Sequence, residues 1–342
     1  MKATSPTSRI VAAVLLIGLL AGGVSLFIAA MRQTGPANPG TPNAPSSASV
    51  STLRPADTAT IDAILNAANE YLKTEQPQKA DAILAAATLQ HPDEQRLYIL
   101  HAEALASMRR LDAAYDAYVK ALAIGPRDGE SEFAAGTLAS MTGKLDRAAE
   151  HYQAAQTALK ADPRPPLYLA QIQIKLHQID EAKASLAIAG KLDPESAIVW
   201  GTLAQIALDE NRLNLARQHA AKARELEPRV TMWRVLEARA LRRLNQPEEA
   251  LAILTPLDDI EKRDKMVLGL IGECFGLLNR PADAAALYAK AADFDPSDGP
   301  LALDTALWFE RAGDKITALK YAEHAAMLST QGAATTVERL KQ

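Results

Sequence analysis

The sequence is poor in the residue types on which several classes of protein depend. Its 342 residues include one cysteine, Cys274, so no disulfide within the chain can stabilise the fold. Aromatic residues make up 5% of the chain although 48% of it is apolar, which favours thin, closely stacked helices and argues against an all-β protein. Lysine and arginine (37) do not outnumber aspartate and glutamate (41), and a net charge of −4 argues against a nucleic-acid partner.

The motifs of common catalytic and cofactor sites are also missing. None of the six histidines has a second histidine three or four residues away, and Cys274 has no CxxC partner, so no metal site is expected. The sequence contains no GxSxG, no Walker loop and no dinucleotide fingerprint after a strand. We therefore expect no catalytic residue and no cofactor, and we expect the protein not to be an enzyme.

One long apolar run is present, at residues 10–31. It carries no charge over 22 residues, and at about 1.5 Å per residue a helix of this length reaches roughly 33 Å, enough to cross a bilayer core. Lys2 and Arg9 on one side, against Arg32 on the other, would keep residues 1–9 in the cytoplasm. The pattern predicts a single-pass membrane protein whose C-terminal domain lies on the exported side, in the periplasm if the source is a Gram-negative bacterium.

Two further interpretations of this run stay open. Ile28 and Ala30 are placed where a signal peptidase site would lie, so the run also fits a cleaved signal peptide, although it exceeds the roughly 7 to 15 apolar residues usual there. Gly18 and Gly22 form a GxxxG motif, which would let two such helices pack closely as a homodimer.

Residues 32–57 are rich in proline and poor in apolar residues. Such a composition predicts a disordered, extended linker between the apolar run and the rest of the chain.

An internal repeat with a period of 34 runs through the remainder. Alanine recurs at every step of 34, eight times without insertion or deletion, which indicates a repeat architecture. The row is Ala80, Ala114, Ala148, Ala182, Ala216, Ala250, Ala284 and Ala318. Twelve residues before each member stands Ala or Gly, and seven residues after it stands Ala in seven of the eight repeats.

Each repeat contains two helical stripes of apolar residues, at 61–74 and 78–89 in the first repeat. The small residues would let the two helices approach closely. Between them, five of eight residues in one row are Gly or Asn, which tolerate the left-handed helix C-cap. That row is Glu75, Arg109, Gly143, His177, Asn211, Asn245, Asn279 and Gly313. We predict an all-α fold with eight repeats over residues 58–330, closing near residues 92, 126, 160, 194, 228, 262, 296 and 330.

This two-helix unit resembles the tetratricopeptide repeat (TPR) family, most fully in AIVWGTLAQIALDENRLNLARQHAAKARELEP, residues 197–228. The resemblance covers residues 61–330. It implies a right-handed α-solenoid whose concave face comes mostly from the first helices, and it implies protein or peptide partners.

The resemblance also maps particular side chains onto the concave face. Phe133 and Tyr168 are expected to form an aromatic shelf there, and three arginines a positive patch suited to carboxylates. The candidate partner-binding residues are Asn69, Phe133, Tyr168, Gln171, Gln205, Arg239, Arg242 and Arg243.

Two parts of the chain depart from the regular pattern. In the sixth repeat Arg234 and Glu237 stand where apolar groups belong, and Pro256 interrupts the second helix. After the last repeat, residues 331–342 are expected to form a capping helix opened by a capping box from Thr335 to Glu338.

The sequence thus predicts a membrane-anchored, non-catalytic scaffold that binds proteins or peptides, with a role in assembly or quality control of envelope proteins taken from anchored relatives. The alternatives are a soluble exported scaffold released by cleavage near Ala30, and, more remotely, an enzyme with a site in the sixth repeat.

Overall fold

The structure, a computed structural model, describes residues 55–342 and divides them into two compact units. Unit 1 ends at Leu192, and unit 2 runs from Asp193 to Gln342. The predicted membrane helix at residues 10–31, with its Gly18 and Gly22 contact, lies outside the described residues. Within residues 55–342 no helix combines the length and apolar character needed to cross a membrane.

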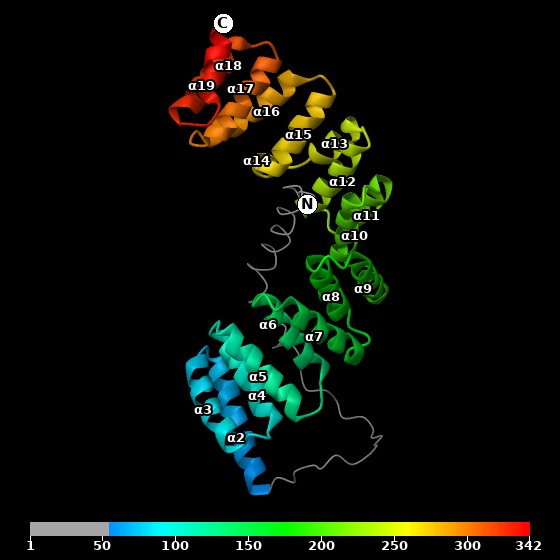
Figure 1. Cartoon of the computed structure of the whole chain (residues 1–342), viewed down its shortest axis with the longest axis vertical. Helices are drawn as coiled ribbons and strands as arrows, with labels where there is room; N and C mark the ends of the chain where they lie inside the picture. The colour runs from blue at the N-terminus through cyan, green and yellow to red at the C-terminus, as the bar shows by residue number, and fades with distance from the viewer. Residues whose placement is uncertain (1–54) are drawn as a thin grey trace, which may run out of the picture. The chain divides into compact units, whose positions relative to one another are not determined.

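Unit 1 contains four helix pairs, each followed closely by the next (Figure 1). They are α2 (Pro55–Lys73) with α3 (Pro77–Gln90), α4 (Gln95–Ser107) with α5 (Leu111–Ile124), α6 (Gly129–Met141) with α7 (Leu145–Ala158), and α8 (Arg164–Lys175) with α9 (Ile179–Leu192). Pro55, the first described residue, already lies in α2, three residues before the boundary predicted at residue 58.

Unit 2 contains the other four pairs and two additional helices (Figure 1). The pairs are α10 (Ala197–Asp209) with α11 (Leu213–Leu226), α12 (Thr231–Arg243) with α13 (Pro247–Leu254), α15 (Lys265–Leu277) with α16 (Pro281–Phe294), and α17 (Gly299–Arg311) with α18 (Lys315–Met327). The additional helices are α14 (Asp259–Arg263) and α19 (Ala333–Lys341). Eight helix pairs in succession confirm the predicted all-α solenoid.

The turn inside every pair has the left-handed conformation expected from the sequence. We call the row of eight residues from Glu75 to Gly313, spaced by 34, the turn row. All eight of its residues have positive φ, from 52° at Asn279 to 84° at Gly313. The next residue donates its amide to a carbonyl five positions earlier, as from Gln76 to Tyr71 (2.8 Å) and from Arg212 to Ala207 (2.7 Å). These 6→1 bonds are those of the Schellman motif, which satisfies carbonyls at the end of the first helix.

The rows of small residues lie where the helices approach most closely. All eight alanines of the row that begins at Ala80 are 0% exposed. The first-helix row is equally buried, and two of its members are glycine for a steric reason. A Cβ on Gly136 would lie 2.9 Å from the Tyr152 ring, and one on Gly272 would lie 2.8 Å from the Tyr288 ring. Large aromatic rings thus fill the space that the missing side chains leave.

The sixth repeat and the C-terminal cap differ from the regular pattern. Pro256 follows a second helix, α13, of only eight residues, and the inserted α14 opens with a capping box between Asp258 and Glu261. The cap α19 exists, but it begins at Ala333 after Gly332, so Thr335 lies inside the helix and the predicted capping box from Thr335 to Glu338 does not form. The left-handed Gly332 (φ 84°) starts the helix earlier than the polar pattern indicated.

Candidate binding surfaces on the first helices

The eight candidate residues all lie on first helices, but their exposure differs greatly. Asn69 on α2 and Arg243 on α12 are exposed, whereas Tyr168, Gln171, Arg239 and Arg242 are half-buried. Phe133 and Gln205 are buried, at 6% and 7% exposure. Four of the eight residues belong to unit 1 and four to unit 2.

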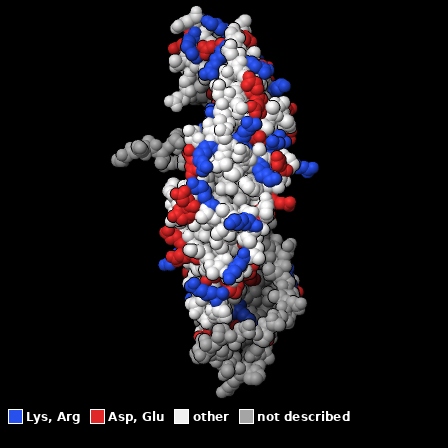
Figure 2. All heavy atoms as spheres, turned by 90° about the vertical axis from the view of Figure 1, so that its right-hand side faces the viewer, with Lys and Arg blue, Asp and Glu red and all other residues white. Residues whose placement is uncertain are grey.

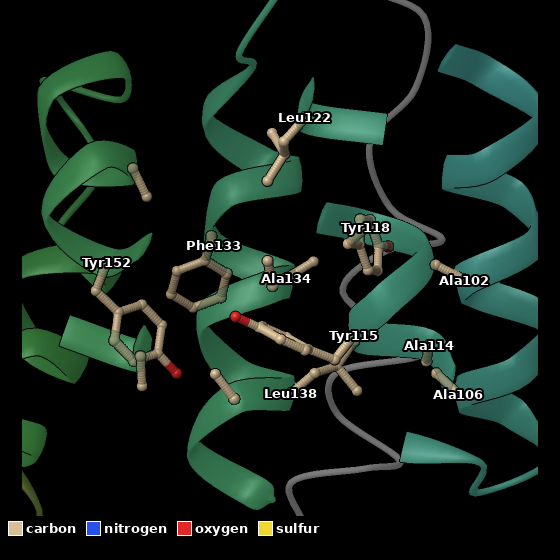
Figure 3. Close-up of a cluster of buried hydrophobic side chains, with 14 of the residues drawn as sticks. Ala102, Ala106, Ala114, Tyr115, Tyr118, Leu122, Phe133, Ala134, Leu138 and Tyr152 are labelled. Carbon is tan, nitrogen blue, oxygen red and sulfur yellow. The ribbon is translucent and has the colours of Figure 1, made fainter. Parts of the chain in front are cut away.

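Phe133 belongs to the core of unit 1. Its ring centroid lies 5.5 Å from that of Tyr152 and 5.2 Å from that of Tyr168, the latter edge-on. Figure 3 shows the Phe133 and Tyr152 rings turned toward each other between helices. The expectation of an open aromatic shelf is therefore wrong for Phe133, because the small Ala and Gly neighbours leave a volume that its ring fills.

A row of alternating charges joins the first helices of unit 1. Arg96 pairs with Asp62 (2.8 Å), and Arg164 pairs with Glu130 (2.7 Å), in each case between equivalent positions of neighbouring repeats. This row was not predicted from the sequence, although Asp, Arg, Glu and Arg alternate there at a step of 34. These arginines are already engaged by carboxylates of their own chain.

Glu103, on α4, occupies the position in the second repeat that Asn69 has in the first, and it is a half-buried residue whose carboxyl group is largely removed from water. Burial raises its pKa from 4.5 to about 7. The adjacent Tyr118 is buried as well, at 2% exposure. Near neutral pH this part of the first-helix face of unit 1 therefore changes charge, which makes the stability of the fold sensitive to pH there.

In unit 2, two of the three predicted arginines are engaged within the chain. Arg243 donates to the Leu208 carbonyl oxygen (2.7 Å) and to Asn211 Oδ1 (2.8 Å), so it caps the end of α10. Arg242 Nε forms an ion pair with Glu273 Oε2 on α15 at 3.1 Å, although this nitrogen makes no hydrogen bond among the described residues. The guanidinium of Arg239 has neither a hydrogen bond nor an ion pair to any residue from 55 to 342, and burial lowers its pKa. Of the three arginines, Arg239 is therefore the one whose guanidinium is not engaged by another described residue.

A buried ion pair joins the irregular sixth repeat to the repeat before it. Arg224 Nε on α11 lies 2.6 Å from Glu237 Oε2 on α12, and Glu237 is 5% exposed. Glu237 thus replaces an apolar side chain, since Leu169 and Ile271 stand at the same position of other repeats. Among the described residues no group of three or more His, Cys, Asp or Glu side chains is placed to hold a metal ion.

A second buried pair joins the two helices of the third repeat. His151 Nδ1 on α7 lies 2.7 Å from Glu132 Oε2 on α6, and Glu132 is among the most deeply buried side chains of unit 1. Arg127 Nε approaches the other oxygen of Glu132 at 3.4 Å. The pair connects α6 with α7 inside the core, which favours a structural role.

On the face shown in Figure 2, the charges do not mark a binding patch. On the face shown in Figure 2, Lys and Arg lie interspersed with Asp and Glu among uncharged residues. No large area of one sign appears there among the described atoms, in keeping with the small net charge of −4.

Two family models match the chain. One, described as Psidin, N-terminal TPR repeats region, matches residues 206–313, and the other, described as tetratricopeptide repeat, matches residues 139–206. A search of curated proteins finds no match.

Solved structures of bacterial proteins, two of them described as TPR proteins, resemble the fold. A TPR protein from Parabacteroides merdae is 15% identical, with a TM-score of 0.52 over 72% of this chain and 99% of its own. PilF of Pseudomonas aeruginosa is 16% identical, with a TM-score of 0.52 over 64% of this chain and 99% of its own. The C-terminal part of a TPR protein from Cytophaga hutchinsonii is 12% identical, with a TM-score of 0.52 over 80% of this chain and 99% of its own. At these identities the similarity is one of fold.

Proposed function

Because the chain belongs to the tetratricopeptide repeat family, we propose that it is a scaffold that binds other proteins through its repeats and works by binding alone. The observation that carries this proposal is the regularity of the fold: the same small-residue contacts and left-handed turns recur in all eight helix pairs. Repetition of this kind presents a row of first helices in each unit, and such rows are suited to extended or helical partners.

The proposal includes a location. The uncharged run at residues 10–31 would anchor the chain in a membrane, and Lys2 and Arg9 would place the repeats on the exported side. In a Gram-negative bacterium the repeats would work in the periplasm, in assembly or quality control of envelope proteins, by analogy with anchored members of the family. The alternative is a soluble exported scaffold, released by cleavage near Ala30.

Membrane partitioning separates these two locations. We expect the full chain to remain in the membrane pellet after an alkaline wash, with its N-terminal residues still present by mass spectrometry. Recovery of the chain only in the soluble fraction, beginning near residue 31, would overturn the anchor and support the released form.

Crosslinking in cells tests the scaffold itself. The full chain is compared with a control that contains residues 1–57 alone, which keeps the apolar run and the linker but lacks every repeat. We expect partner proteins that crosslink to the full chain and not to the control, and that recover the full chain in reciprocal capture. Identical sets of crosslinked proteins would contradict a function carried by the repeats.

A further inference from the structure

A surface of unit 2 where α12 and α15 lie side by side combines features that regular packing does not explain. We call it the α12–α15 surface and define it by Met232, Arg239, Met266, Gly269 and Glu273. The two helices contact each other, and the ion pair between Arg242 and Glu273 (3.1 Å) crosses from one to the other. Because Met232 and Met266 occupy equivalent positions of neighbouring repeats, as do Arg239 and Glu273, each helix contributes the same turns to this surface.

Gly269, in the middle of α15, has no packing role. A Cβ added there would meet no atom within 4 Å, whereas one on Gly272, in the next turn, would lie 2.8 Å from the Tyr288 ring. Glycine inside a helix is less favourable than alanine, because it loses more conformational freedom on folding. Close approach of another backbone is a usual reason for a glycine at such a place.

The guanidinium of Arg239 is half-buried, and it has no hydrogen bond or ion pair to another residue from 55 to 342. The carboxylates that influence it are already engaged, since Asp209 accepts from Gln205 Nε2 (2.9 Å) and Glu273 pairs with Arg242. No hydrogen bond or ion pair to its guanidinium is formed by the described part of the chain. A half-buried guanidinium in this position gains most from an incoming carboxylate, which can accept two parallel hydrogen bonds.

Gln205 is a second polar group near this surface, and its amide oxygen lacks a hydrogen-bond donor among the described residues. Its residue is 7% exposed, and its Oε1 is buried without a hydrogen-bond donor among the described residues, although Nε2 is engaged. Gln205 occupies the position of Arg239 in the preceding repeat, on α10, which packs beside α12. An unsatisfied buried acceptor is costly, so a donor brought by a ligand would be favourable after a small adjustment of the side chain.

The charged row that begins at Asp62 in unit 1 becomes apolar in unit 2. At the step of 34 that gives Asp62, Arg96, Glu130 and Arg164 in unit 1, unit 2 has Ile198, Met232, Met266 and Pro300. Ile198 is 41% exposed, and both methionines are half-buried. Methionine is flexible and polarizable, so it adapts to varied apolar side chains of a ligand.

From this combination we infer that the α12–α15 surface docks an extended peptide segment of a partner protein: an Asp or Glu side chain of the peptide pairs with Arg239, its backbone passes over Gly269, and an apolar side chain lies against Met232 and Met266. This inference rests on the proposed scaffold function and assigns it a site and a ligand class. Charge complementarity selects an acidic segment, and the open space at Gly269 selects an extended one.

The probe is a displayed library of short linear peptides, selected against the purified full chain. We expect the selected peptides to share an acidic residue near apolar residues. The affinity of one labelled peptide, measured by fluorescence anisotropy, should fall about tenfold or more in Arg239→Gln. Gly269→Leu should weaken binding by a similar factor, because the new side chain fills the space over which the backbone passes.

The matched control is Arg229→Gln, which removes one exposed positive charge before α12 and should leave the affinity unchanged. A double-mutant cycle identifies the direct partner of Arg239. Replacing the acidic residue of the peptide by its amide should weaken binding to the original chain and have little effect on binding to Arg239→Gln. Circular dichroism checks that each variant keeps its helices.

Three results would overturn the inference. They are selection without any binder, binders that lack acidic residues, and binders whose affinity is unchanged by Arg239→Gln and by Gly269→Leu. The scaffold function would stand if partner proteins still crosslink to the full chain and not to residues 1–57. Loss of those crosslinks as well would show instead that the scaffold function is wrong.

Discussion

At the scale of single residues, the turn row shows which positions depend on backbone conformation. Gly143 and Gly313 adopt positive φ without steric cost, but Glu75, Arg109 and His177 adopt it as well, with φ of 57°, 58° and 61°. A side chain in the left-handed region costs roughly 1–2 kcal/mol per residue. The surrounding Schellman hydrogen bonds hold these residues there, so each of them carries strain that a glycine would relieve.

Arg109→Gly is therefore expected to stabilise unit 1 by about 0.5–1 kcal/mol, because the relief of strain exceeds the greater entropy of glycine in the unfolded chain. The measurement is the free energy of unfolding in urea. Arg109→Ala is the control, since alanine keeps the Cβ that causes the strain. Equal stability of the two variants would show that the Arg109 side chain, rather than the left-handed backbone, sets the effect.

Ala182 tests the tight contact between helices. It is 0% exposed on α9, so Ala182→Leu should overpack the fourth helix pair and lower the free energy of unfolding by about 1 to 3 kcal/mol. Ala184→Leu, on the exposed side of the same helix, should leave stability nearly unchanged. A neutral Ala182→Leu in thermal or urea unfolding would mean that the row does not occupy the closest approach.

At the scale of helices, the buried pair between α11 and α12 shows how a charge can replace a hydrophobic contact. Glu237 stands where Leu169 and Ile271 stand in other repeats, and Arg224 compensates its charge at 2.6 Å. Such a pair contributes little net stability, but removing one partner leaves a buried charge uncompensated.

Arg224→Met should therefore destabilise unit 2 by about 2–4 kcal/mol, because Glu237 would lose its partner. The double variant Arg224→Met/Glu237→Leu should recover most of that loss, since leucine restores the apolar group of neighbouring repeats. Tryptophan fluorescence suits the measurement, because Trp200, Trp233 and Trp308 all lie in unit 2. A double variant as unstable as the single one would argue for a role of the pair beyond charge compensation.

At the scale of the whole molecule, Glu103 makes stability depend on pH near neutrality. Its pKa is raised to about 7 by burial, from an ordinary value of 4.5. Between these values the folded chain binds a proton that the unfolded chain releases. The stability linked to Glu103 is therefore fully present below about pH 4.5 and is lost as the pH rises through about 7.

Glu103→Gln should remove this part of the pH dependence and raise the free energy of unfolding at about pH 8 by about 1 to 3 kcal/mol. Urea unfolding at a series of pH values from about 5 to about 8 measures it. Glu338→Gln, at an exposed position of α19, is the control and should leave the profile unchanged. A profile for Glu103→Gln that runs parallel to that of the original chain would contradict the shifted pKa.

The sequence by itself determined the fold almost completely, because its signals are local and repeated. The period of 34, the alanine rows and the Gly and Asn turn residues depend on contacts within one helix pair and between neighbours, so each can be recognised from spacing alone. The same spacing pattern located the irregular sixth repeat through Pro256. It misplaced the start of α19, because Gly332 begins that helix through its backbone conformation rather than through a polar side chain.

Only the tertiary structure decided which first-helix residues are available to a partner. Phe133 and Arg239 both lie on first helices, yet Phe133 fills the core beside Tyr152, whereas Arg239 has no partner among the described residues. Arg243 has the same charge as Arg239 but is used to cap α10. Exposure and pairing depend on neighbouring repeats and on the size of their side chains, and a one-dimensional pattern does not contain that information.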